Sequence, residues 1–230
     1  MKHQSDILAL KYRPKDFSDL IGQEYLVDTI QKSIQLNKIP NAYIFTGIRG
    51  VGKTTTARIV AKMLNCTSFD TSNKPDLLNC EQAKAITEDR HPDVIEIDAA
   101  SNTSVENARE IIENVKYNPV LGKYKVYIID EVHMLSNNAF NALLKTLEEP
   151  PAHVKFIFAT TEIRKVPVTV LSRCQRFDLR RIEPEEMIKM LQNLANLENA
   201  SISNEALALI TRASEGSARD AQSLLDQAIS

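Results

Sequence analysis

This 230-residue sequence predicts an α/β fold in which a doubly wound parallel sheet is followed by a small helical domain. Short apolar runs rich in β-branched and aromatic residues alternate with helical or turn segments along the first three quarters of the chain. A glycine-rich turn follows the first run. After residue 181 the strand pattern stops and only helical periodicity remains. We therefore expect an α/β domain over residues 1–181 and a three-helix lid domain over residues 182–230.

Five apolar runs are interpreted as strands, the last with a weaker pattern: Tyr43–Thr46, Val94–Ile97, Val126–Ile129, Phe156–Ala159 and Arg176–Leu179. A helix follows the glycine-rich turn, from Thr55 to Leu64. A capping box at Thr103–Glu106 opens another helix. Ser136 is positioned to cap a third helix, which the proline pair beginning at Pro150 ends.

In the lid domain a start signal precedes each predicted helix. Pro184 suits the first helical position, and Ser203 and Ser217 are positioned as N-caps of the next two helices. Apolar residues recur at helical spacing after each signal, so we expect three short helices that each bury one face.

Composition restricts the class of protein. The net charge of −2 argues against a globally basic nucleic-acid binder, although local patches or helix N-termini remain able to bind nucleic acid. No apolar run reaches membrane-spanning length, and the first ten residues lack the apolar core of a secretory signal, so no membrane contact is expected. Three cysteines suit a reducing compartment. We expect a cytoplasmic protein.

The segment Gly47–Thr54 matches the phosphate-binding loop pattern G-x-x-x-x-G-K-[ST]. Its glycines let the backbone turn N–H groups toward phosphate oxygens, and the N-terminus of the next helix favours an anion. Lys53 would reach the β- and γ-phosphates, and the Thr54 hydroxyl would bind Mg²⁺. The alternative, a glycine-rich turn with a chance lysine, is disfavoured by the strand–loop–helix context. The residues expected to hold the nucleoside triphosphate are Gly47, Gly50, Val51, Gly52, Lys53, Thr54 and Thr55.

Two carboxylates end the third apolar run. Asp130 would hold Mg²⁺, partly through water, and Glu131 would orient and deprotonate an attacking water. Acidic residues also end strands at protein surfaces without any catalytic role, and the loop upstream is what favours the catalytic interpretation. His133 is interpreted as a supporting or surface imidazole, since Glu131 already fills the role of base.

Two further candidates each have an ordinary alternative. Thr161 follows the fourth run, where its hydroxyl could bond the attacking water or the γ-phosphate, but threonine is also a common strand residue. Arg173 lies in an arginine-rich stretch. That stretch is either a solvated basic face or the source of a cation for the γ-phosphate of a neighbouring subunit. The residues alone leave both alternatives open.

Several motifs together resemble those of AAA+ clamp-loader ATPases: the phosphate-binding loop, Asp130–His133, Leu10–Pro14, Leu20–Glu24 and Ser172–Cys174. Glu96–Ser101 and Phe140–Pro151 are similar to the γ/τ subunits of bacterial DNA polymerase III. The resemblance covers the chain from Ala9 to Ile229. It implies an ATPase that uses ATP and Mg²⁺ to load a sliding clamp on primed DNA during replication, and that has no polymerase chemistry of its own.

The resemblance also implies residue roles and partners. Thr161 would be the first sensor, Arg173 the arginine finger offered to the next subunit, and Arg219 the second sensor. The implied partners are the δ and δ′ subunits, further γ/τ copies, the sliding clamp and primed DNA. The residues that would border the adenine are Tyr12, Arg13, Pro14 and Gly22, with Gln23 nearby.

Positions that match DNA-facing regions of the family are uncharged in this chain. Family members often carry basic residues there, so contact would come from hydroxyls and helix N–H groups, with lower affinity. These positions are Asn102, Thr103, Ser104, Ser136 and Asn137.

The four-cysteine zinc module of the family is incomplete. Cys66 and Cys80 remain, Pro75–Leu78 replaces the middle pair, and His91 is too far along the chain to complete the set. Structural zinc needs four ligands, so we expect none to bind.

Two alternatives to a clamp-loading ATPase are of different classes. A structural subunit like δ′ shares the fold and the Ser172–Cys174 motif but does not hydrolyse ATP. Intact Lys53–Thr54 and Asp130–Glu131 favour the ATPase. A branch-migration helicase of the AAA+ class is disfavoured because it lacks the Ser-Arg-Cys motif.

Overall fold

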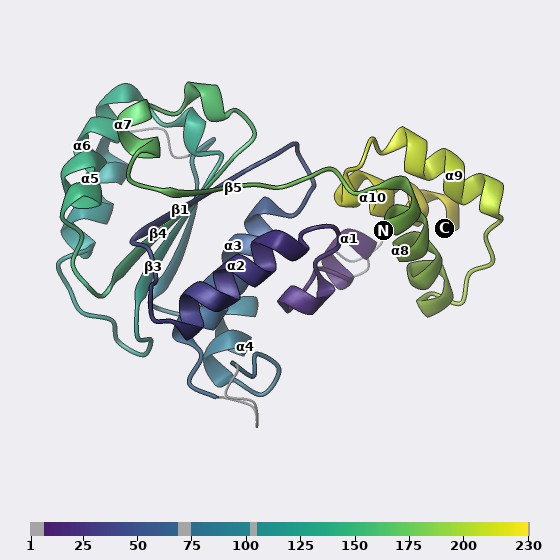
Figure 1. The fold of residues 1–230 in the computed structure, drawn as a ribbon, viewed down its shortest axis with the longest axis horizontal. Coiled ribbons are helices and arrows are strands. Elements are labelled where there is room, and N and C mark those ends of the chain that lie inside the picture. The colour runs from purple at the N-terminus through teal and green to yellow at the C-terminus, as the bar shows by residue number, and fades with distance from the viewer. Residues whose placement is uncertain (1–6, 69–74, 102–104, 230) are drawn as a thin grey trace.

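The computed structural model describes residues 7–68, 75–101 and 105–229, and its centre is a five-stranded sheet (Figure 1). The strands lie in the order β2-β3-β4-β1-β5. Every neighbouring pair is parallel, so each connection crosses a face of the sheet. The five predicted strands are confirmed, the weakly patterned fifth included. Their bounds are Ala42–Thr46 (β1), Val94–Asp98 (β2), Lys125–Asp130 (β3), Val154–Thr160 (β4) and Gln175–Asp178 (β5).

Helices cover both faces of this sheet, as Figure 1 shows. Because side chains alternate along a strand, Tyr43 of β1 faces one hydrophobic cluster and Ile44 faces the other. The first cluster includes α2 (Glu24–Gln35), α3 (Lys53–Asn65) and α4 (Glu81–Thr87). The second includes α5 (Val105–Asn114), α6 (Asn137–Glu148) and α7 (Val168–Leu171). The doubly wound arrangement is therefore confirmed. Within the described ranges, no helix has both the length and the apolar character that a membrane span requires.

Three further helices follow the sheet: α8 (Pro184–Leu197), α9 (Asn204–Ala213) and α10 (Ala218–Ile229). Pro184 opens α8, and the hydroxyls of Ser203 and Ser217 accept hydrogen bonds from first-turn N–H groups of α9 and α10. The short helix α1 (Leu8–Lys11) lies beside them (Figure 1), with Leu8 buried in their hydrophobic cluster. The lid is thus completed by a segment from the other end of the sequence, while its boundary at residue 182 stays a prediction.

The three central strands bring distant segments to one edge of the sheet. Thr46 at the end of β1 is in register with Thr160 at the end of β4. β4 also pairs with β3, which ends at Asp130, so these two strands are neighbours in the sheet. We call this side the carboxyl edge and the opposite side the amino edge. The loop after β1 and the residues after β3 and β4 all emerge at the carboxyl edge.

Candidate nucleotide site

The loop between β1 and α3 has the backbone of an anion-binding turn. Gly52 is the N-cap of α3 with a φ of +101°, where a residue with a Cβ is strained. The first N–H groups of α3 have no partner inside the helix and open toward the loop. Val51, a residue of the loop, is buried, and Thr55 lies in the first turn of α3.

Gly50 is the point where the lid meets this loop. A Cβ at Gly50 would lie 2.1 Å from the hydroxyl oxygen of Ser217, so no larger residue fits without movement. The N–H of Arg219 donates to the carbonyl of Gly50 at 3.2 Å. The predicted second sensor therefore lies in the first turn of α10, directly over the loop. The loop pattern alone could not predict this steric requirement for glycine at position 50.

Lys53 is buried although it carries an ammonium group, with 6% of its surface exposed. Its Nζ donates to the carbonyl of Ile48 across the loop at 2.9 Å. Burial lowers the pKa of Lys53, while the carboxylates of Glu131 and Asp130 act in the opposite direction. A buried cation this close to helix N–H groups suits an anionic ligand.

Thr54 and Asp130 meet across the edge of the sheet. Thr54 Oγ1 donates to Asp130 Oδ2 at 2.5 Å, and Asp130 Oδ1 accepts from the N–H of Glu131 at 2.9 Å. A hydroxyl and a carboxylate are hard oxygen ligands of the kind that Mg²⁺ takes beside phosphates. The donor set therefore fits the predicted metal.

Glu131 has a left-handed backbone, with φ and ψ both 45°. Such a conformation is uncommon outside glycine and is found preferentially at functional sites. Its Oε2 accepts from the N–H of Thr161 at 3.1 Å and from the Thr161 hydroxyl at 3.0 Å. The structure thus brings together the predicted base and the predicted first sensor.

The side chain of His133 is only 6% exposed, and it links the ends of β3 and β4. Its Nδ1 lies 3.0 Å from Thr160 Oγ1 and 3.3 Å from Glu131 Oε2, and its Nε2 lies 3.5 Å from Glu162. A surface position is therefore wrong. The contact with Glu131 agrees with the supporting role.

The residues predicted to border the adenine lie before α2, and two of them, Tyr12 and Gly22, lie beside side chains at α8 of the lid. The hydroxyl of Tyr12 donates to Glu198 at 2.5 Å, and its ring packs on the lid cluster. Burial lowers the pKa of Arg13, and the charges of Arg58 and Arg219 add to that effect. Pro14 lies in the loop after α1. Tyr12 therefore bonds the lid, and Arg13 lies close enough to Arg219 for their charges to interact.

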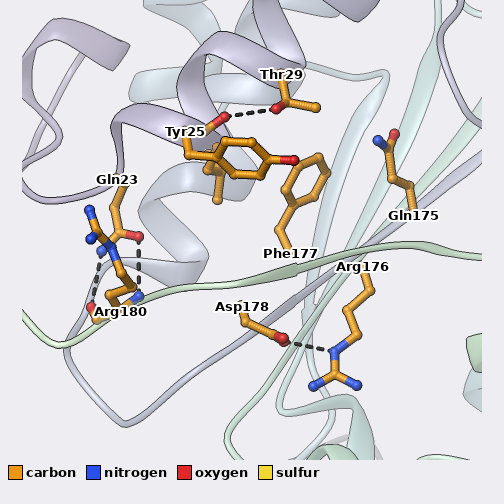
Figure 2. Close-up of a pocket in the computed structure, with 9 residues that line it drawn as sticks. Gln23, Tyr25, Thr29, Gln175, Arg176, Phe177, Asp178 and Arg180 are labelled. Carbon is orange, nitrogen blue, oxygen red and sulfur yellow. Dashed lines mark hydrogen bonds and ion pairs between the residues drawn. The ribbon is translucent and has the colours of Figure 1, made fainter.

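Gly22 and Gln23 join the segment before α2 to the connection between β5 and α8 through hydrogen bonds with Arg180. Figure 2 shows Gln23 beside Arg180. Gln23 is 4% exposed, and its amide donates to the carbonyl of Arg180 at 3.0 Å and accepts from the Arg180 N–H at 3.2 Å. The Arg180 guanidinium donates to the Gly22 carbonyl at 3.0 Å. This anchor for the sheet-to-lid connection was missed, since nothing local marks residues so far apart in sequence.

A cavity of about 510 Å³ lies between α2 and β5 (Figure 2). It is lined by Gln23, Tyr25, Leu26, Thr29, Gln175, Arg176, Phe177, Asp178 and Arg180. None of these residues belongs to the phosphate-binding loop or to the carboxylate pair. The cavity therefore lies outside the phosphate-binding loop and the carboxylate pair, although Gln23, which is predicted to lie near the adenine, lines it.

Arg173 lies just after α7, and its hydrogen bonds reach neither the phosphate-binding loop nor the carboxylate pair. Its guanidinium donates to the carbonyl of Thr169, to the hydroxyl of Ser172 and to the carboxylate of Glu148. About a third of its side chain is exposed, at 31%. The arginine is thus fixed on the surface of its own chain. Its partner Glu148 was missed, although it lies inside the Phe140–Pro151 motif.

Of the positions predicted to face DNA, Asn102, Thr103 and Ser104 lie outside the described residues. Ser136 is exposed, and its hydroxyl caps α6 by accepting from the N–H of Ala139 at 3.2 Å. Asn137 is the first residue of α6 and is also exposed. The N-terminus of α6 therefore presents polar groups to solvent.

Cys66 and Cys80 are both buried, and the Cys66 thiol donates to the carbonyl of Ser68 at 3.0 Å. Burial acts to raise the pKa of Cys80, but hydrogen bonds from Cys66 and from backbone N–H groups lower it to about 7. Both ring nitrogens of His91 bond elsewhere, to Gln82 and to a backbone N–H. Among the residues that the structure describes, no group of three or more metal-ligating side chains forms.

Comparison with known proteins places the chain in a family. Residues 22–183 match a family model described as DNA polymerase III, delta subunit, and residues 186–230 match the ATPase lid domain of DNA polymerase III clamp-loader subunits. A Thermotoga maritima RuvB, described as a Holliday junction branch migration motor, has a TM-score of 0.66 at 19% identity, over 91% of this chain and 62% of that one. At that identity the likeness supports the fold alone.

Curated relatives decide between the subunit types. The DNA polymerase III subunit tau of Salmonella typhimurium is 50% identical over 97% of this chain and 34% of its own length. The subunit tau of Bacillus subtilis is 48% identical over 95% of this chain and 38% of its own length. The chain spans about a third of the length of these relatives. Identity this high along nearly the whole chain outweighs the delta name of one model, and the chain belongs to the γ/τ family of bacterial DNA polymerase III clamp-loader subunits.

Proposed function

We propose that this chain is the ATP-hydrolysing part of a clamp-loader subunit, which uses ATP binding and hydrolysis to place a sliding clamp on primed DNA during replication. The observation that carries the proposal is the convergence at the carboxyl edge. There Lys53 and Thr54 lie beside Asp130, and Glu131 bonds Thr161. A purely structural subunit has no need for this combination.

Each group has a definite task in hydrolysis. The N–H groups at the start of α3 and the ammonium of Lys53 would bind the β- and γ-phosphates of ATP. Thr54 and Asp130 would hold Mg²⁺, which neutralises charge on the phosphate oxygens when bound. Glu131 would accept a proton from the attacking water, and Thr161 would keep its carboxylate in position. Arg219 would bring the lid onto the γ-phosphate.

The remaining roles depend on partners. Arg173 would contribute its cation to ATP bound by the adjacent subunit, in a cytoplasmic complex with δ, δ′ and further copies of this chain. Tyr12, Arg13, Pro14 and Gly22 would border the adenine. The exposed start of α6, Ser136 and Asn137, would meet the DNA backbone through a hydroxyl and N–H groups, together with Asn102, Thr103 and Ser104. Polymerase chemistry would belong to other subunits.

Clamp loading by the full-length chain tests the proposal. The chain is assembled with its partner subunits, and sliding clamp retained on primed circular DNA is measured by gel filtration with and without ATP. Loading should require ATP and should be abolished by Lys53→Ala, because no other cation of the loop replaces the buried ammonium. Loading that survives Lys53→Ala in every copy would favour a structural subunit similar to δ′.

Subunit mixing tests the role of Arg173. Complexes are assembled from copies that carry either Lys53→Ala or Arg173→Ala, and ATP hydrolysis is measured. Activity should appear only where an intact loop faces an intact Arg173, since arginine fingers in trans contribute up to about 10³–10⁵ in rate. Weaker ATP binding by the Arg173→Ala chain itself would show that the arginine acts within its own subunit.

A further inference from the structure

Glu148 and Arg173 form an ion pair that joins the end of α6 to the end of α7. Glu148 Oε1 accepts a hydrogen bond from Arg173 Nη2 at 2.5 Å. The pair is accessible, because 49% of the Glu148 side chain and 31% of the Arg173 side chain are exposed. The proposed chemistry of the chain gives no role to Glu148.

The guanidinium of Arg173 is held on three sides by its own chain. Nη1 donates to the carbonyl of Thr169 at 2.5 Å and to the hydroxyl of Ser172 at 3.2 Å. A guanidinium has five N–H donors, so these bonds and the bond to Glu148 use three of them. The remaining two lie on Nε and Nη2, and no acceptor among the described residues bonds them. Two donors are what a bidentate contact with a phosphate needs.

We propose that Glu148 is a positioning residue for Arg173, holding the guanidinium so that its two remaining donors face the γ-phosphate of the adjacent subunit. This inference rests on the proposed function. An arginine side chain has several rotatable bonds, and fixing it before the reaction lowers the entropy lost in the transition state. Thr169 and Ser172 hold only Nη1 of the guanidinium. The bond between Glu148 and Nη2 therefore fixes the rotation of the guanidinium.

The geometry also argues against a purely structural pair. Both residues lie at the surface, where an ion pair contributes little to folding and is screened by salt. α6 and α7 are already joined through buried residues of the second hydrophobic cluster, including Leu147 and Val170. The packing of these helices therefore does not depend on the ion pair.

The test uses the full-length chain assembled with its partner subunits, sliding clamp and primed DNA. Steady-state ATP hydrolysis is measured for Glu148→Gln, for Arg173→Ala and for the double variant. Glu149→Gln is the matched control, because it removes the same charge from an exposed neighbour. Glu148→Gln should lower kcat, because the guanidinium loses one of its restraints. The loss should be only about three- to tenfold, because an exposed ion pair is weak. KM for ATP should stay unchanged, and the control should match the wild type.

The double variant separates positioning from structure. If Glu148 acts through Arg173, Glu148→Gln should cause no further loss once Arg173 is alanine. An equal loss in both backgrounds would overturn the proposal in favour of a structural role. A rise in kcat would overturn it by showing that Glu148 withholds the arginine. Unchanged kcat in Glu148→Gln beside a collapse in Arg173→Ala would refute this inference alone. Unchanged turnover in Arg173→Ala would instead refute the proposed arginine finger.

Discussion

The polar and charged side chains at the two edges of the sheet differ in how fully the chain itself supplies their hydrogen-bond partners. At the amino edge, Asp93 is fully buried, and its carboxylate accepts three backbone hydrogen bonds, at 2.7, 2.6 and 2.7 Å, from Val120, Leu121 and Gly122. Asn65, also fully buried, accepts from the N–H of Tyr124 and donates to its carbonyl. These groups are satisfied within the chain, and they fix the turn that leads into β3.

At the carboxyl edge the buried ammonium of Lys53 is held less completely. Lys53 bonds one carbonyl, and Glu131 adopts a left-handed backbone. Ligation by phosphate and Mg²⁺ would supply the missing partners. The comparison teaches that the buried polar residues at the amino edge are satisfied within the chain, while the function we propose assigns the charged residues at the carboxyl edge to a ligand. Substitutions at the two edges should therefore affect different properties.

The largest effect is expected at the carboxyl edge. Glu131→Gln should reduce ATP hydrolysis by about 10²–10⁴-fold, because an amide cannot accept the proton of the attacking water. ATP binding should remain, since Lys53 and the loop are unaltered. Phosphate release and filter binding measure the two properties separately. A parallel loss of ATP binding would remove Glu131 as the base.

The second effect is expected at the amino edge. Asp93→Asn should lower the free energy of unfolding by about 2–3 kcal/mol, because an amide nitrogen would face N–H donors that need acceptors. ATP affinity should not change. Denaturant unfolding measures stability, with Asp28→Asn on the exposed face of α2 as the control. A loss of ATP affinity with unchanged stability would contradict the comparison between the edges.

The same variant has a defined pH dependence. Burial acts to raise the pKa of Asp93, but the three N–H donors outweigh it and lower the pKa below its ordinary 3.8. A lowered folded-state pKa contributes stability above the unfolded pKa, and that contribution is lost as pH falls through the folded value. The difference between wild type and Asp93→Asn should thus be full at neutral pH and shrink in acid below about pH 4.

A smaller effect is expected where the lid meets the loop. Gly50→Ala should cost about 1–3 kcal/mol of stability without nucleotide, because its Cβ would overlap Ser217. Gly52→Ala is the matched control, since its backbone φ is also positive but its nearest neighbour would lie 4.0 Å away. Thermal unfolding should therefore show the greater loss for Gly50→Ala. Equal losses would mean that backbone strain alone requires both glycines.

The smallest effect is expected from metal removal. Cys66 and Cys80 pack inside the first hydrophobic cluster and bond backbone groups, so a zinc chelator should leave the melting temperature unchanged. Elemental analysis should find less than about one zinc per chain. A chelator-induced drop in melting temperature would show that ligands outside the described residues complete a site.

Much of the site was predictable because its signals are local. The glycine and lysine spacing of the loop at Gly47–Thr54 and the caps at Ser136 and Ser203 depend on backbone geometry within a few residues. The carboxylate pair at Asp130 follows an uninterrupted apolar strand. Each pattern therefore specified its own element before any tertiary contact was considered.

Contacts between distant elements could not be read in this way. Three such contacts join residues whose separation along the chain carries no periodic signal. They are the contact of the lid with Gly50, the two hydrogen bonds between Gln23 and Arg180, and the contact of the His133 ring with Thr160. Each depends on the order of the strands and on how the chain returns to the sheet. A periodic pattern fixes which face of an element is apolar and leaves its partner open.

By itself, then, the sequence determined the five strands, the helices that have local start signals, and the groups that could bind phosphate, metal and water, because short-range sterics and hydrogen bonding select them. The tertiary structure alone decided which of these groups meet. Parallel pairing of β3 with β4 set Glu131 against Thr161, packing of α6 beside α7 placed Glu148 on Arg173, and α1 came to complete the lid. The physical reason is that burial of apolar surface is non-directional, so only the whole chain's packing selects one set of distant partners.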